Sequence, residues 1–134
     1  MTAPQTAANS SREAAIAAAR AAASKQAADI VILDVRAVIV ITDFFVIASG
    51  GTARQVKTIV EAVEKALRDR GERPVRREGE TEGRWVLLDY IDVVVHVFAD
   101  EEREYYDLER LWRDAPKLPG RDPPTARTQP PPGE

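Results

Sequence analysis

The sequence predicts a single α/β domain in which helices flank a mixed β-sheet. Segments rich in β-branched and aromatic residues alternate with segments of helical periodicity. A chain of 134 residues with 44% hydrophobic content is long enough for one domain with a sizeable core. Residues 44–48 are apolar at every position, which is typical of an interior strand.

Two helices are predicted from capping signals and apolar spacing. The first is the Ala-rich run from Ser10 to about Ala28, with Ser10 and Glu13 as a capping box. The second begins with a capping box of Thr52 and Gln55 and stops at Gly71. Its buried stripe consists of Val56, Ile59, Val60, Val63 and Leu67.

A third helix and six strands complete the predicted order α-β-β-β-α-β-β-β-α. The third helix covers residues 100–112 and is capped by Asp100. Its inward residues are expected to be Tyr105, Leu108, Leu111 and Trp112. The strands are expected at residues 30–35, 38–41, 44–48, 74–77, 85–90 and 92–98.

Composition sets the predicted boundaries of the domain. Residues 1–9 are expected to form a flexible tail, and residues 10–115 the folded domain. Seven of the nine prolines fall within residues 116–134, so this segment is expected to be a disordered Pro-rich tail.

The composition also excludes several classes of site. There is no Cys and only one His, so Cys-based zinc sites, disulfides and His-rich metal sites are excluded within one chain. No metal or cofactor is expected. The chain has no long apolar run and no secretory signal, which predicts a cytoplasmic protein without membrane contact.

The distribution of charge suggests two further surfaces. The net charge of −3 argues mildly against a dedicated nucleic-acid binder. Arginines nevertheless cluster between residues 68 and 77, where contact with RNA is an open alternative to a solvated surface. The members of this cluster are Arg68, Arg70, Arg73, Arg76 and Arg77.

The segment from Trp85 to Phe98 carries the main candidate for a binding surface. Side chains alternate along strands, so Val86, Leu88 and Tyr90 share one face with Val93, Val95 and Val97. If this apolar set is buried, the opposite face displays an aromatic and acidic group that suits docking to a partner. That group comprises Trp85, Leu87, Asp89, Asp92 and His96. A core position for Trp85 remains the alternative.

Catalytic interpretations find less support in the sequence. The turn at residues 49–52, with Gly50 and Gly51, precedes a helix and could cradle a phosphate, but a tight turn with positive φ explains it as well. Asp89 and Asp92 are three residues apart, and no D-x-D pair occurs. The runner-up function is therefore a nucleotide-binding or nucleotidyltransferase-like enzyme that uses the Gly50–Gly51 turn.

Several ordered blocks between residues 28 and 112 resemble the ribosomal silencing factors, also called Iojap-like proteins. The blocks cover residues 41–50, 54–56, 78–79, 85–90, 92–98 and 106–112. The chain departs from the family pattern at Ile91, where the family commonly has Gly, and at Gly51, where it has a polar residue.

The resemblance implies a nucleotidyltransferase-like fold without catalytic acids and a translation repressor that is not an enzyme. It implies binding to the large ribosomal subunit through ribosomal protein L-fourteen, which blocks joining of the small subunit when nutrients are short. It also implies a tendency to form homodimers off the ribosome. The partner surface is expected at the aromatic and acidic group, with a second candidate at Arg103, Tyr106 and Glu109 on the last helix.

Overall fold

The computed structural model describes residues 7–37, 41–105 and 116. The elements in chain order are α1 (Ala7–Ser24), β1 (Ala28–Asp34), β2 (Phe44–Gly50), α2 (Ala53–Asp69), β3 (Arg76–Glu78), β4 (Trp85–Asp89), β5 (Val93–Ala99) and α3 (Asp100–Tyr105). The predicted α/β class with a mixed sheet flanked by helices is confirmed.

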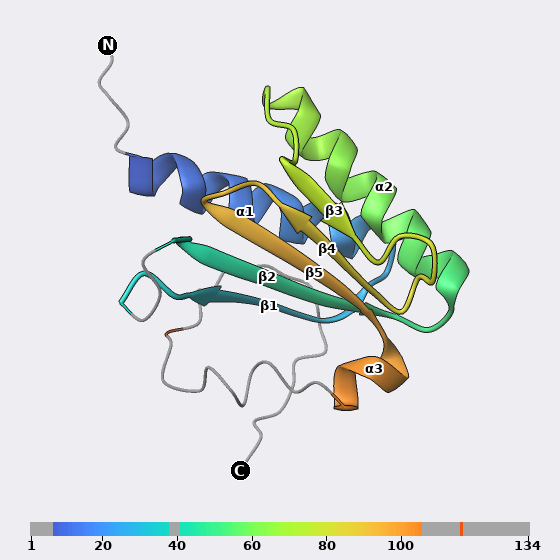
Figure 1. Ribbon diagram of the computed structural model, residues 1–134. Helices are drawn as coiled ribbons and strands as arrows, with labels where there is room; N and C mark the ends of the chain where they lie inside the picture. Colours follow the sequence, from blue (N-terminus) through green and yellow to red (C-terminus); the bar gives the residue numbers. More distant parts are fainter. Residues whose placement is uncertain (1–6, 38–40, 106–115, 117–134) are drawn as a thin grey trace.

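The sheet has the strand order β1-β2-β5-β4-β3 (Figure 1). Strands β2 and β5 are parallel, and the other neighbouring pairs are antiparallel. β2 is an interior strand with six of its seven residues buried, as its apolar sequence predicts. β3 forms one edge with three residues, all exposed.

Helices α1 and α2 lie together on one face of the sheet (Figure 1). The main core fills the space beneath them. From the sheet it includes Val86 and Leu88 of β4, and Tyr90 just after that strand. It also includes Val93, Val95 and Val97 of β5. The predicted alternation of these two strands is therefore confirmed. Helix α3 lies on the opposite side, where β5 ends (Figure 1).

Helix α1 begins earlier than the sequence predicts. It starts at Ala7, so residues 7–9 of the expected tail are helical. The capping box of Ser10 and Glu13 is wrong, because Ser10 lies inside the helix. Small side chains let α1 approach the sheet and α2 closely. Those at the contact are Ala14, Ala15, Ala18 and Ala22, each at most 1% exposed.

Helix α2 has the ends that the sequence predicts. Thr52 is the N-cap, and its hydroxyl accepts a hydrogen bond from Gln55 N at 3.0 Å. The Gln55 side chain accepts from Gly51 N at 2.7 Å, one residue before the N-cap amide that a capping box would use. At the other end, Gly71 has φ +87, and the amides of Gly71 and Glu72 donate to Arg68 and Leu67. This is a Schellman motif, which requires the left-handed residue.

Other predicted boundaries moved or fall outside the described residues. Ile41 lies in a bend, and residues 38–40 of the expected second strand are outside the described part of the chain. The strand expected at 74–77 is β3, two residues later. Helix α3 is described only through Tyr105, so Leu108, Leu111 and Trp112 are not covered. Pro116, the first residue of the expected tail, accepts a 2.7 Å hydrogen bond from Asp34 N of β1.

The turn between β4 and β5 carries backbone strain. Ile91 has φ +76, a region that β-branched residues rarely adopt. Asp92 N donates to Tyr90 O at 2.9 Å, which makes Ile91 the centre of a three-residue turn. The carboxylate of Asp89 accepts from Ile91 N at 2.8 Å. The turn is thus tight even though Ile replaces the Gly that the family resemblance leads one to expect.

Replacing Ile91 with Gly should raise the free energy of unfolding by about 1 kcal/mol. Glycine removes the left-handed strain, and the 56% exposed side chain buries little area. Ile41→Gly is the matched control, because Ile41 is 80% exposed and does not have positive φ. It should lower stability by about 0.5–1 kcal/mol through chain entropy. Urea unfolding of both variants measures the difference, and equal losses would contradict the strain argument.

Candidate docking face

The sheet face opposite α1 and α2 carries a second group of packed side chains. We call it the aromatic face and define it by Phe45, Trp85, His96 and Phe98. Its buried residues include Leu33, Val35 and Ile47, with Trp85, Phe45 and Val31 packed partly buried against them. The strand register brings these side chains together, because Trp85 pairs with Phe98, Leu87 with His96, and Ile47 with His96.

The rings of the aromatic face contact one another in a continuous array. Trp85 stacks on Phe98 with ring centroids 4.9 Å apart, and Phe45 meets His96 edge-on at 5.0 Å. The planes of His96 and Phe98 differ by only 11° at 6.3 Å. Such offset and edge contacts are favourable for aromatic pairs, so they fix the orientation of Trp85 on the sheet.

His96 is a buried neutral residue of this array. Trp85 Nε1 donates to His96 Nδ1 at 3.1 Å, and since an indole only donates, the imidazole proton lies on Nε2. Nε2 is buried and has no hydrogen-bond partner among the described residues. Burial lowers the pKa of His96 to about 4. The ring is therefore neutral at physiological pH and poorly matched to general acid or base work near pH 7.

The other predicted surface residues lie along the same side and its rim. Leu87 and Asp89 are half-buried on the aromatic face, and Asp92 is exposed in the β4–β5 turn. Asp89 also has structural contacts, with Ile91 N at 2.8 Å and with Arg76 at 3.4 Å. Within the predicted group Asp92 is therefore exposed, Trp85, Leu87 and Asp89 are partly buried, and His96 is buried.

Trp85 does not protrude as a free anchor. The face assignment from the sequence agrees with the structure, but the Trp85 side chain is partly buried and not fully exposed as expected. Its indole is stacked on Phe98 and bonded to His96, so Trp85→Ala would also remove packing worth about 2–3 kcal/mol of stability. Sequence reasoning had not included Phe45 in the site, although its alternation with the core residue Phe44 signalled which face it occupies.

Arg103 has a different place from the one expected on the last helix. It is 9% exposed and donates to Ser49 Oγ at 2.6 Å and to the Asp29 carbonyl at 2.7 Å. These bonds attach α3 to the end of β2 and the beginning of β1. Arg103 is thus not available on the surface as a partner contact, and that expectation is corrected. Tyr106 and Glu109 lie outside the described residues.

The Gly50–Gly51 turn is organised as a helix cap. Neither glycine has positive φ, so the expected left-handed turn is wrong. Gly50 is needed for space, because a Cβ there would lie 3.1 Å from Val56 N and 3.2 Å from the Ile59 side chain. The amides of Gly51 and Gln55, which a phosphate would use, already donate to Gln55 Oε1 and Thr52 Oγ1. The geometry favours the cap over a phosphate cradle.

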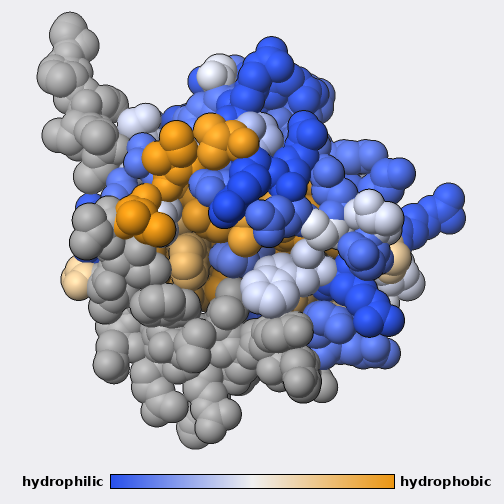
Figure 2. Space-filling view, viewed as in Figure 1, coloured by the Kyte–Doolittle hydropathy of each residue, from blue (hydrophilic) through white to orange (hydrophobic). Residues whose placement is uncertain are grey.

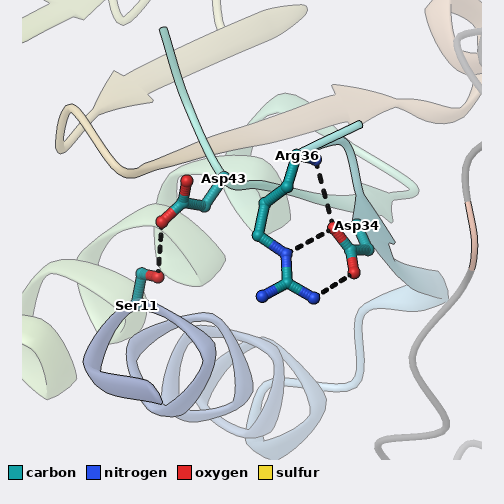
Figure 3. Close-up of polar contacts among 4 residues, drawn as sticks. All are labelled: Ser11, Asp34, Arg36 and Asp43. Atoms are coloured by element: carbon teal, nitrogen blue, oxygen red, sulfur yellow. Dashed lines mark hydrogen bonds and ion pairs between the residues drawn. The ribbon is translucent and has the colours of Figure 1, made fainter. Parts of the chain in front are cut away.

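Asp34 at the end of β1 and Asp43 just before β2 each accept hydrogen bonds from another side chain (Figure 3). Arg36 donates to both oxygens of Asp34, at 2.8 and 2.6 Å, and this hydrogen bonding lowers the pKa of Asp34. Ser11 Oγ of α1 donates to Asp43 at 2.8 Å. Within the described residues, no three His, Asp or Glu side chains form a group able to hold a metal ion.

The arginine cluster is divided by the fold. Arg77 pairs with Glu64 at 2.7 Å, Arg76 pairs with Asp89 at 3.4 Å, and Arg70 lies 3.9 Å from Glu13. Arg68 and Arg73 are exposed and line a hollow of about 470 Å³ beside α2 and β3. The cluster therefore does not form one basic surface, since three of its members neutralise acidic neighbours.

Few large apolar side chains are exposed in the described part of the chain. The exposed large hydrophobic residues among those described are Ile41, Val75 and Ile91. Figure 2 shows an apolar patch where β4 turns into β5, with hydrophilic residues beside it on the side of α2. No helix in the described ranges is long and apolar enough to cross a membrane.

Comparison with known proteins gives this arrangement a family. The family described as "Ribosomal silencing factor during starvation" matches residues 8–132. The chain belongs to the ribosomal silencing factor family. The match extends over most of the Ala-rich beginning and the Pro-rich end, which the resemblance seen in the sequence did not cover.

Related family members confirm the assignment. The ribosomal silencing factor RsfS of Halalkalibacterium halodurans is 44% identical over 94 residues, 70% of this chain and 80% of its own length. A mouse protein named "Mitochondrial assembly of ribosomal large subunit protein 1" is 34% identical over 91 residues, 66% of this chain and 40% of its own.

A solved structure supports the fold directly. A crystal structure of a Chromobacterium violaceum protein has a TM-score of 0.74 at 34% identity, over 87% of this chain and 92% of that one.

The buried imidazole of this family member should make stability fall in acid. Below pH about 6.5 the unfolded chain binds a proton at His96, while the folded state stays neutral until pH about 4. This difference removes about 3 kcal/mol of stability as the pH falls through that window. His96→Asn keeps an acceptor for Trp85 Nε1 but does not titrate.

Urea unfolding at pH 7.5 and pH 4.5 is the measurement. The free energy of unfolding of the variant should fall by about 2–3 kcal/mol less than that of the wild type over this interval. The two proteins have the same carboxylates, so the difference reports on His96. An identical pH dependence in the two proteins would show that His96 is not buried in its neutral form.

Proposed function

We propose that this protein lowers translation by binding the large ribosomal subunit and blocking the joining of the small subunit. The observation that carries the proposal is the family match over residues 8–132. The aromatic face supplies a rigid surface for such a contact, since its rings are fixed by mutual packing. The mechanism is steric, and it requires no chemistry from the protein.

We place the partner contact on the accessible rim of the aromatic face. Leu87 offers a half-buried apolar side chain, and Asp89 and Asp92 offer negative charge beside it. Ribosomal proteins are generally basic, so this surface gains association rate and specificity from complementary charge. Ribosomal protein L-fourteen, implied by the family resemblance, is the proposed partner. Homodimerisation off the ribosome and a cytoplasmic location stay predictions.

Co-sedimentation with separated ribosomal subunits tests the proposal. The protein should pellet with large subunits and not with small ones, and it should slow subunit joining measured by light scattering. Equal recovery with both subunits, or with neither, would contradict the proposal.

Leu87→Ala should weaken large-subunit binding by about tenfold, the effect of losing an interface contact worth about 1.4 kcal/mol. Val75→Ala is its matched control, because Val75 is also an accessible apolar residue, 64% exposed, just before the edge strand β3. The control should bind as the wild type does.

Asp92→Lys should also weaken binding, with a reduced dependence on salt, because it reverses a charge in the proposed contact. Glu101→Lys is the matched charge reversal, since Glu101 is exposed on α3 and lies outside the proposed contact. If Asp92→Lys and Glu101→Lys weaken large-subunit binding equally, the contact does not lie at Asp92. The loss would then reflect only the change in net charge.

A further inference from the structure

The outer surface of α2 carries a row of basic side chains. Its exposed residues Arg54, Lys57, Glu61, Lys65 and Arg68 follow one another at spacings of three or four, so they share one face of the helix. Four of the five are cations. We call Arg54, Lys57, Lys65 and Arg68 the basic ridge.

Most of this positive charge is not neutralised within the fold. Arg54, Lys57 and Arg68 form no ion pair with any other described residue, while Lys65 pairs with Asp69 at 3.0 Å. The arginines of β3 differ, because both Arg76 and Arg77 are paired with carboxylates. Three unpaired cations thus share one exposed face of α2 in a chain of net charge −3.

We propose that the basic ridge binds the phosphate backbone of RNA. From residue 54 to residue 68 the helix rises about 21 Å. A nucleic-acid duplex presents about one negative charge per 1.7 Å of its axis, so phosphates can face every cation of the ridge at once. The contact reads no base sequence, because phosphate contacts position a protein without specifying bases.

The burial of the other face of α2 distinguishes RNA from a membrane surface. A helix that binds lipid headgroups inserts an apolar stripe beside its cations. The apolar stripe of α2 is occupied by the protein core, with Val56, Ile59, Val63 and Leu67 fully buried. Only the charged face is left for a ligand.

The position of α2 allows the ridge to act at the same time as the aromatic face. The helix covers the sheet face opposite Trp85 and His96, so a partner on one face leaves the other accessible (Figure 1). Three or four phosphate contacts give weak, salt-sensitive affinity by themselves. Tethered beside RNA by a protein contact, the same ridge acts at high effective concentration.

Fluorescence anisotropy with a labelled RNA duplex of arbitrary sequence tests the proposal. The wild type should bind at low salt, and the logarithm of its affinity should fall with the logarithm of salt concentration with a slope of about −3 to −4. The triple variant Arg54→Gln, Lys57→Gln, Arg68→Gln should lose at least about tenfold in affinity and most of this slope. Glutamine has a helix propensity close to that of Lys and Arg, so α2 should stay folded.

The matched control removes the same charge from α1 and the residue after it. Arg12→Gln, Arg20→Gln, Lys25→Gln changes three exposed cations that lie off the ridge, and it should bind RNA as the wild type does. Circular dichroism melting of both triple variants verifies that each is folded.

Three results would overturn the proposal. They are absence of wild-type binding at low salt, equal losses in the two triple variants, and binding of labelled poly-glutamate as tightly as RNA. The last would assign the ridge to an acidic protein segment. Because the duplex contains no ribosomal protein, each result is independent of the subunit sedimentation experiment.

Discussion

The parallel pairing of β2 with β5 determines which side chains of the two central strands reach the aromatic face. In this register Phe45 is beside Val94 and Ile47 beside His96, while Val46 and Val95 point into the core under the helices. A slip of one residue would move His96 into that core and Val95 out of it. Parallel neighbours also need a crossover, and α2 lies in the connection between these strands. One pairing thus separates the aromatic face from the basic ridge.

The sequence predicts those features that depend on local periodicity. The alternation of Val86 and Leu88 with Leu87 assigns the two faces of β4, and the Thr52 and Gly71 signals locate the ends of α2. The limits of prediction arise where tertiary contacts decide. Alternation shows that Trp85 lies opposite the main core, but not that a second group of apolar side chains packs around it.

Other features follow from distant partners that no local pattern records. Arg103 lies among acidic neighbours in the sequence, so its burial follows only from the positions of Ser49 and the Asp29 carbonyl, 54 and 74 residues away. The positive φ of Ile91 is likewise imposed by the β4–β5 pairing, because isoleucine by itself disfavours it. The early start of α1 has a local origin instead, since its alanines are favourable at any helical position.

Two buried polar groups show what the packing costs. Tyr90 has a buried hydroxyl with no hydrogen-bond partner among the described residues, and burial, with a contribution from Glu64, raises its pKa to about 12. On the other face of the sheet, His96 Nε2 is also buried without a hydrogen-bond partner among the described residues. Each such group costs about 1–3 kcal/mol. The sheet therefore carries an unsatisfied polar atom on both sides, and its stability rests on the apolar residues around them.

The short edge strand β3 has a consequence for the behaviour of the protein at high concentration. An exposed strand edge is a template on which another chain can add a strand, the usual first step toward aggregates. Here the edge consists of Arg76, Arg77 and Glu78, all exposed and charged, with only three residues available for pairing. Two of these side chains are already engaged within the fold, Arg76 with Asp89 and Arg77 with Glu64. A short, fully charged edge of this kind disfavours the addition of a strand from another molecule, so open-ended growth of the sheet is disfavoured at β3.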